Sequence, residues 1–251
     1  MLPLILLLLP PAEPTKPDRE KVVQGARVVV AAIIRAGKEN GKRDRPHKGD
    51  ELTALYVQSA VEAAKELPAA EAMPALNLGL GVAMDRSALM RFNPVVGLTW
   101  RRVETNAERT ARLAALGEPT MFGRHDLAQH FFVSAALTAV LGAKAADAAG
   151  VAKELLDAQE GGSGFSFADL AADMGGVHFA SRLIESPERA KAIGKRFRVA
   201  DYAIGPKGLD EDLAMKDFEK KYGGTGDERY KKKRREIKSR IEALPGYEEA
   251  K

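Results

Sequence analysis

Apolar residues recur at three- and four-residue intervals along most of this 251-residue chain, which is the spacing of amphipathic helices. No stretch alternates apolar and polar residues for long enough to predict a sheet. We therefore predict an all-α protein, an irregular helical bundle with a central three-helix unit and a charged C-terminal helical arm. The predicted helices lie at about residues 19–37, 50–67, within 69–89, 106–116, 126–144, 147–159, 167–185, 210–222 and 228–244.

The composition agrees with this class. Hydrophobic residues make up 45% of the chain and aromatic residues only 6%, which favours helices packed closely on small side chains over a β-sandwich. The net charge of +4 is mild and both signs are mixed, so nucleic acid is not favoured as a partner. The absence of cysteine excludes disulfides, thiolate zinc sites and a lipid-modified cysteine.

The chain divides into three parts. Residues 1–17 carry an apolar run, Leu2 to Leu9, which is too short to span a bilayer and resembles the core of a signal peptide. It lacks a basic residue before the run and a small-x-small cleavage site. We expect a signal or targeting segment and linker at 1–17, a helical domain at 18–185, and a charged, partly helical extension at 186–251 packed on it. An exported, periplasmic or envelope-associated protein follows from this expectation.

Two features outside the central helices invite a binding interpretation. Gly79 and Gly81 interrupt an apolar segment, but no Lys-Ser/Thr pair follows them, so close helix packing is favoured over a phosphate loop. Trp100 lies beside two arginines, and we expect it to cover the edge of a core rather than stack on a base. Residues 90–120 are otherwise predicted to be a linker around one short helix.

The chemistry-bearing residues gather at 125–176, among apolar helical runs. Asp169 and Asp173 are four apart on one helix, and Glu154 and Asp157 are three apart on another, so each pair shares a face. If the three central helices form a bundle, these side chains converge with His130, as metal and carboxylate sites in bundles do. His125 precedes the helix and His178 is turned away, so neither is included. The candidate catalytic cluster is His130, Glu154, Asp157, Asp169 and Asp173.

Three uses of this cluster remain open. The first is a divalent metal on His130 and carboxylates with a water nucleophile, and the second is a metal-free acid/base pair such as Glu154 with Asp173. The third is a buried His–Asp pair that serves packing specificity alone. The sequence has no H-E-x-x-H motif, so it leaves the cofactor undetermined.

The basic run from Lys231 to Arg235 is typical of phosphate or anionic-lipid contacts. Its helix also carries three glutamates, which favours a solvated face. A narrow apolar stripe should hold this helix against the domain, or against a partner chain, so the oligomeric state is left open. The stripe consists of Tyr230, Ile237, Ile241 and Leu244.

The central stretch resembles the YfiM-like family of predicted bacterial periplasmic or outer-membrane lipoproteins and, more distantly, VanZ-like proteins. The resemblance covers about fifty residues and implies an envelope location and a compact helical domain, but no activity. Because the chain has no cysteine, the lipid anchor of these lipoproteins is not expected in this protein. The matching residues are Asp126, His130, Phe131, Lys153, Glu154, Asp157, Phe165, Ser166, Asp169, Leu170, Asp173 and Gly176.

These observations favour a cell-envelope helical protein whose His/carboxylate cluster is a structural or ligand-binding site. The alternative is a hydrolase that uses the five cluster residues, with or without a divalent metal. A weaker alternative is a binder of anionic surfaces, including peripheral membrane contact, through Lys231 to Arg235.

Overall fold

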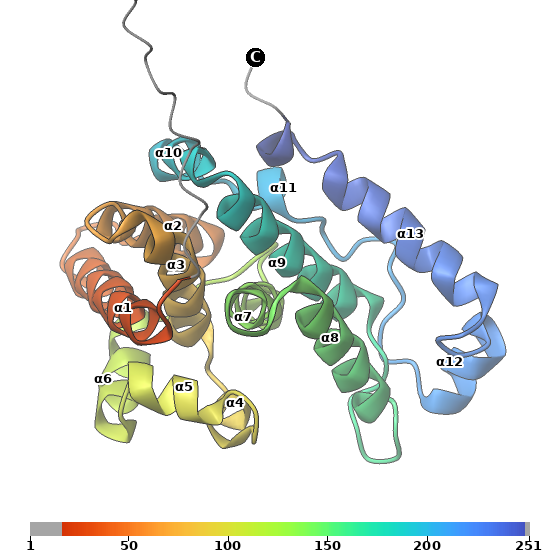
Figure 1. The fold of residues 1–251 in the computed structure, drawn as a ribbon. Helices are drawn as coiled ribbons and strands as arrows, with labels where there is room; N and C mark the ends of the chain where they lie inside the picture. Colours follow the sequence, from red (N-terminus) through yellow and green to blue (C-terminus); the bar gives the residue numbers. More distant parts are fainter. Residues whose placement is uncertain (1–16, 249–251) are drawn as a thin grey trace, which may run out of the picture.

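The computed structural model describes residues 17–248, and within this range the chain forms thirteen α-helices and two short 3-10 helices without a β-strand (Figure 1). The predicted all-α class is confirmed. Apart from Pro17, the expected signal segment at 1–17 lies outside the described residues. Between residues 17 and 248, no helix combines the length and the apolarity that crossing a bilayer requires.

The N-terminal layer consists of α1 (Arg19–Gly41), α2 (Gly49–Ala64) and α3 (Ala69–Met84). Nearly every residue of α3 is buried, because α1 packs on one side of it and α7 on another. A Cβ at Gly79 would lie 2.5 Å from Val29 of α1, and one at Gly81 would lie 2.7 Å from the carbonyl oxygen of Phe132 in α7. The two glycines therefore serve close helix packing, as predicted.

Three small helices follow: α4 (Leu89–Phe92), α5 (Gly97–Val103) and α6 (Asn106–Leu116). The prediction of a linker with one helix was wrong here, because α4 and α5 are too short to show a helical period in the sequence. Trp100 is buried and donates its indole N–H to Asp85 (3.2 Å), which confirms that it covers the core. Arg112, also buried, bonds Glu104 (2.8 Å) and anchors α6.

The central unit consists of α7 (His125–Leu141), α8 (Ala143–Asp157) and α9 (Phe167–Glu185). Gly142, with φ +86°, ends α7 and lets α8 begin at the next residue, earlier than predicted. Helix α7 lies near the middle of the molecule, between the N-terminal layer and α9 (Figure 1). A Cβ at Gly176 would collide with the carbonyl oxygen of Phe131, so only glycine permits this approach of α9 to α7.

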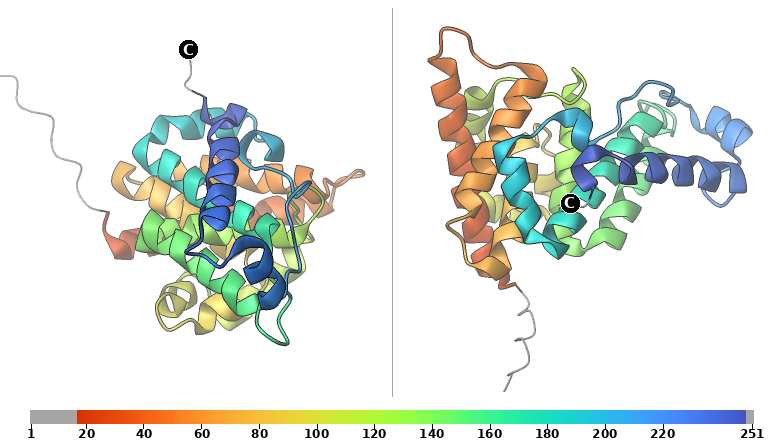
Figure 2. Two further views of the ribbon diagram at one scale, coloured as in Figure 1. Left: turned by 90° about the vertical axis from the view of Figure 1, so that its right-hand side faces the viewer. Right: turned by 90° about the horizontal axis from the view of Figure 1, so that it is seen from above.

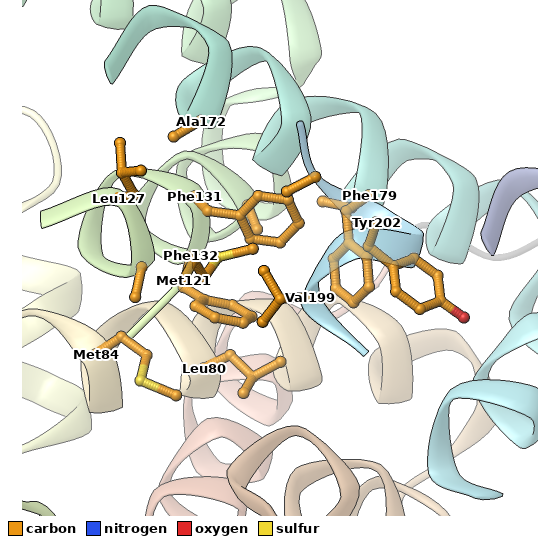
Figure 3. Close-up of a cluster of buried hydrophobic side chains, with 14 of the residues drawn as sticks. Leu80, Met84, Met121, Leu127, Phe131, Phe132, Ala172, Phe179, Val199 and Tyr202 are labelled. Atoms are coloured by element: carbon orange, nitrogen blue, oxygen red, sulfur yellow. The ribbon is translucent and has the colours of Figure 1, made fainter. Parts of the chain in front are cut away.

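The apolar face of α7 and α9 forms the centre of the core (Figure 3). The rings of Phe131 and Phe179 lie 5.4 Å apart, Phe132 packs on both, and Tyr202 meets Phe179 edge-on at 5.7 Å. Each such buried side chain contributes about 1.5–3 kcal/mol to folding. This packing fixes α7 against α9 and with it the position of the polar residues beside Phe131.

The C-terminal part contains α10 (Ala190–Lys195), α11 (Val199–Tyr202), α12 (Met215–Tyr222) and α13 (Glu228–Glu242), with 3-10 turns at Pro187–Arg189 and Pro245–Tyr247. The segment 191–208, for which no helix was predicted, includes most of α10 and all of α11. Helices α12 and α13 extend to one side of the bundle (Figure 2). An aromatic cluster joins them to the start of α9: the rings of Phe165 and Phe218 stack at 4.2 Å, and Phe167 meets Tyr222 at 4.6 Å.

Helix α13 matches its predicted pattern. Tyr230, Ile237 and Ile241 are buried, which confirms the apolar stripe. Within the basic run, Lys231 pairs with Glu228 of the same helix, and Arg234 reaches across to Asp147 of α8 (2.5 Å). The run is therefore largely neutralised by its own surroundings.

Candidate functional site

The site begins with His130 on α7, which lies between two carboxylates of α9. Its Nδ1 is 3.1 Å from Asp173 Oδ1 and its Nε2 is 3.4 Å from Asp169 Oδ2. Asp169 and Asp173 share one face of α9 because four residues make about one helical turn. The structure thus brings these three side chains together, as the sequence predicted. Their side chains are only 10%, 16% and 6% exposed, respectively.

Glu154 joins the site from α8 and is fully buried. Its Oε1 accepts from Lys153 Nζ (3.0 Å) and its Oε2 accepts from the backbone N–H of Ser166 (2.9 Å), just before α9. The Ser166 hydroxyl in turn accepts from Asp169 N–H (3.0 Å), which is one of the two bonds of a capping box at the start of α9. The reciprocal bond of that box comes from Glu154 on the neighbouring helix rather than from Asp169.

Asp157 is the one predicted member that stands apart. Its carboxylate is 30% exposed and binds Lys153 Nζ at 2.6 Å. It meets the cluster only through this shared ammonium group. Asp126, four residues before His130, pairs with Arg124 (2.5 Å) instead of with the histidine.

Sequence reasoning missed three contributors. Ser134, one turn after His130 on α7, donates its hydroxyl to Asp173 Oδ1 (2.7 Å). Its spacing of four residues from His130 places it on the same helix face, and the sequence could have indicated this contact in that way. Arg124 lies 3.5 Å from Asp169 Oδ1 and also binds Glu211, a contact across 87 residues that spacing cannot indicate. Gly150 lets α8 approach α9, since a Cβ there would lie 2.9 Å from Asp173 Oδ2.

The environment shifts the proton affinities of the site. Burial lowers the pKa of His130, but the carboxylates of Asp173 and Asp169 outweigh it and raise that pKa to about 9. Burial raises the pKa of Glu154 to about 7, although the Lys153 ammonium and the Ser166 N–H favour its charged form. Burial also raises the pKa of Asp169. At neutral pH the site thus holds an imidazolium and a glutamate near its titration midpoint.

Three of these residues are placed to share an ion. One ligand atom each from His130, Glu154 and Asp173 lies within 4.8 Å of the other two, and the three come from α7, α8 and α9. The 3.1 Å between His130 Nδ1 and Asp173 Oδ1 is close to the roughly 3.4 Å expected between two ligands of one tetrahedral ion. Asp169 beside Nε2 then accepts the second ring N–H, the arrangement that orients metal-bound histidines.

Two buried carboxylate oxygens of the site, Asp169 Oδ1 and Asp173 Oδ2, have no hydrogen-bond partner within the described part of the chain. An unpaired buried acceptor costs about 1–3 kcal/mol, and more when it is charged. Asp173 Oδ2 lies against Gly150, where α8 and α9 pack closely. Asp169 Oδ1 has the Arg124 guanidinium 3.5 Å away, so Asp173 Oδ2 is the oxygen of this pair that lacks a partner in the described residues.

No protein-family model, curated protein or solved structure matches this chain. The resemblance to YfiM-like and VanZ-like proteins therefore stays a prediction, and the functional argument depends on the geometry of the site.

Two surface cavities flank the central unit. One, of about 400 Å³, is lined by the Gly161–Gly164 turn and residues 212–216. The other, of about 320 Å³, lies between α8, α9 and α13 and is lined in part by His178. Burial lowers the pKa of this histidine. None of the five predicted cluster residues lines either cavity.

Proposed function

We propose that this protein binds a divalent transition-metal ion through His130, Glu154 and Asp173, within a helical protein of the bacterial cell envelope. One observation carries the proposal: three buried groups capable of ligating a metal, from three helices, lie within 4.8 Å of one another. One imidazole with two carboxylates suits Zn²⁺ or Fe²⁺ better than Mg²⁺ or Ca²⁺, which prefer all-oxygen sets. Three protein ligands also leave a coordination position open.

The charges support this choice. His130 and Lys153 provide two positive charges against the carboxylates of Glu154, Asp157, Asp169 and Asp173, so the ionised cluster has an excess of negative charge. Buried negative charge needs compensation, and the raised pKa values of His130 and Glu154 agree with protons in that role. A metal ion that replaces these protons would supply the same compensation.

The arrangement favours binding over turnover. Glu154 is fully buried and His130 and Asp173 are nearly so, and neither flanking cavity includes a cluster residue. A hydrolase needs room for a substrate beside the metal or the base. The hydrolase alternative therefore lacks a supporting observation in the described residues and stays a prediction.

The envelope location depends on sequence features alone, the apolar run Leu2 to Leu9 and the YfiM-like resemblance. It is tested separately by the N-terminal sequence of protein recovered from the periplasmic or secreted fraction. A mature N-terminus near residues 12–17 is expected, and an intact Met1 in cytosolic protein alone would contradict export.

The metal proposal is tested by elemental analysis and Zn²⁺ titration of the purified full chain. We expect one equivalent per chain, with Glu154→Gln and Asp173→Asn each weakening affinity by more than the roughly 100-fold that outer-shell changes cause. Asp157→Asn is the matched control, since Asp157 lies on the same helix as Glu154 but outside the ligand set, and it should bind as the parent does. Absence of bound metal, or equal binding by all three variants, would overturn the proposal.

A further inference from the structure

The segment that contains α4 and α5 exposes an unusual concentration of large apolar side chains. Leu89, Phe92, Val95 and Leu98 are 67%, 79%, 69% and 63% exposed, and they fall within ten residues. We call this set the α4–α5 ridge. The other strongly exposed large apolar residues of the described chain are scattered singly over four other helices. A contiguous exposed apolar patch, unlike scattered residues, marks an interaction surface.

The ridge lies over a packed and hydrogen-bonded base. Val96 and Trp100 are buried beneath it, each with 1% exposure. The Asn93 side chain accepts from the N–H groups of Val95 (2.9 Å) and Val96 (3.2 Å), which fixes the turn between α4 and α5. The inward face is thus satisfied while the apolar residues point outward.

The ridge segment itself carries only basic charges, although two of its arginines pair with glutamates outside it: Arg91 lies 3.7 Å from buried Glu104, and Arg102 pairs with Glu20. From Arg86 to Val103 the chain carries four arginines and no acidic residue. Arg101 is exposed, and it donates to the backbone carbonyl of Arg91 rather than to a carboxylate. Apolar side chains bordered by arginine match the interface of a bilayer with anionic headgroups, where apolar groups enter the acyl boundary and arginines meet phosphates.

The ridge segment packs on the start of α1 and lies far from α13 (Figure 1). Arg102 of α5 pairs with Glu20, and Arg27 donates to the Arg102 carbonyl (3.0 Å), so α1 begins beside α5. The first helix of the described chain therefore lies against the segment that carries the ridge. Helix α13, with its basic run, lies on the opposite side of the molecule (Figure 1).

We propose that the α4–α5 ridge docks on an anionic phospholipid bilayer, with Leu89, Phe92, Val95 and Leu98 at the acyl boundary and Arg101 at the phosphates. This surface is separate from the His/carboxylate cluster and does not depend on it. It also differs from the basic run of α13, in which every charge except that of Lys232 is paired with a carboxylate of the described chain.

The chain provides its own reporter, because Trp100 is its only tryptophan and lies on α5 two residues from Leu98. The full chain is mixed with vesicles of phosphatidylcholine containing one quarter phosphatidylglycerol, with and without lipids brominated near the headgroup. We expect vesicle co-sedimentation that weakens with salt and with removal of phosphatidylglycerol, together with quenching of Trp100 by the brominated lipid.

A paired variant tests the ridge itself. Phe92→Ser with Leu98→Ser should lower vesicle affinity at least about tenfold, because two apolar side chains no longer enter the bilayer. Leu141→Ser with Leu156→Ser, which removes two exposed apolar side chains elsewhere, is the matched control and should bind as the parent does. All four positions are exposed, so both variants should keep the parent's circular dichroism and melting temperature.

Three results would overturn the proposal. The first is a parent chain that does not sediment with anionic vesicles. The second is binding that the ridge variant retains, or that leaves Trp100 unquenched, since the contact would then lie at α13 or the N-terminal segment. The third is a parent dimer that the ridge variant converts to monomer in light scattering without any vesicle binding, which would assign the ridge to a second copy of the chain.

Discussion

The raised pKa of His130 makes a direct prediction about stability without metal. An unfolded histidine titrates near 6.5, and in the folded protein this pKa is about 9. Between those values the folded state holds a proton that the unfolded state has lost, so stability falls as the pH rises. The contribution is fully present below about pH 6.5 and lost as the pH passes 9. Its size is about 3 kcal/mol, because each pKa unit corresponds to about 1.4 kcal/mol.

The assay is urea unfolding followed by circular dichroism in EDTA, at half-unit steps from pH 6 to 9.5. The parent should lose about 3 kcal/mol over this range through His130, in addition to the loss as Glu154 ionises near pH 7, with a constant slope on urea. His130→Gln keeps a hydrogen-bond donor but cannot titrate, so its stability should be nearly flat above about pH 8, where Glu154 is ionised in both the folded and the unfolded state. His178→Gln is the matched control and should keep the parent's slope, because burial lowers the pKa of His178 and places its effect below pH 6.5. A flat parent, or a His130→Gln variant with the parent's slope, would refute the argument.

Three further outcomes follow from the same structure. Zn²⁺ affinity should rise about tenfold per pH unit from pH 7 to 9, because His130 must release its proton when the ion binds. Below pH 7 the rise should be steeper, because Glu154 releases a proton as well. Calorimetry in buffers of different ionisation enthalpy measures the number of protons released at each pH. Gly176→Ala should lower the free energy of unfolding by about 3 kcal/mol, since its Cβ meets the Phe131 carbonyl, whereas Gly41→Ala, with open space around it, should not. Arg112→Met should cost about 3–5 kcal/mol in urea unfolding by leaving buried Glu104 without its main partner, and a loss below 1 kcal/mol would contradict this role.

The sequence was sufficient for the long helices and for part of the site. Residues 125–185 contain three apolar periods long enough to predict α7, α8 and α9. Once these pack together, a spacing of four residues is enough to bring Asp169 and Asp173 to His130. The short helices α4, α5, α10 and α11 were missed because four to seven residues make at most two helical turns, which is too few to show a periodic pattern of apolar residues.

The errors at the site have a different origin, namely contacts between residues far apart in the chain. Asp157 was included because it lies three residues from Glu154, yet Lys153 holds its carboxylate outside the ligand set. Arg124 was omitted because its link to Glu211 depends on how the C-terminal part folds back. Local spacing defines the face of a helix, but the partner that a charge selects on that face depends on tertiary structure.

The bond from Glu154 to the Ser166 N–H ties the first turn of α9 to α8. The N–H of Ser166, the N-cap residue of α9, is bonded only when the preceding helix has docked, so this amide should lose its partner whenever α8 opens. The bulk of α9 is anchored on α7, which makes α8 the element whose departure is less costly. Amide hydrogen exchange at Ser166 should then follow the protection of α8 rather than that of mid-α9. Since Glu154 is also a proposed metal ligand, a bound ion should slow exchange at this amide while leaving the middle of α9 unchanged.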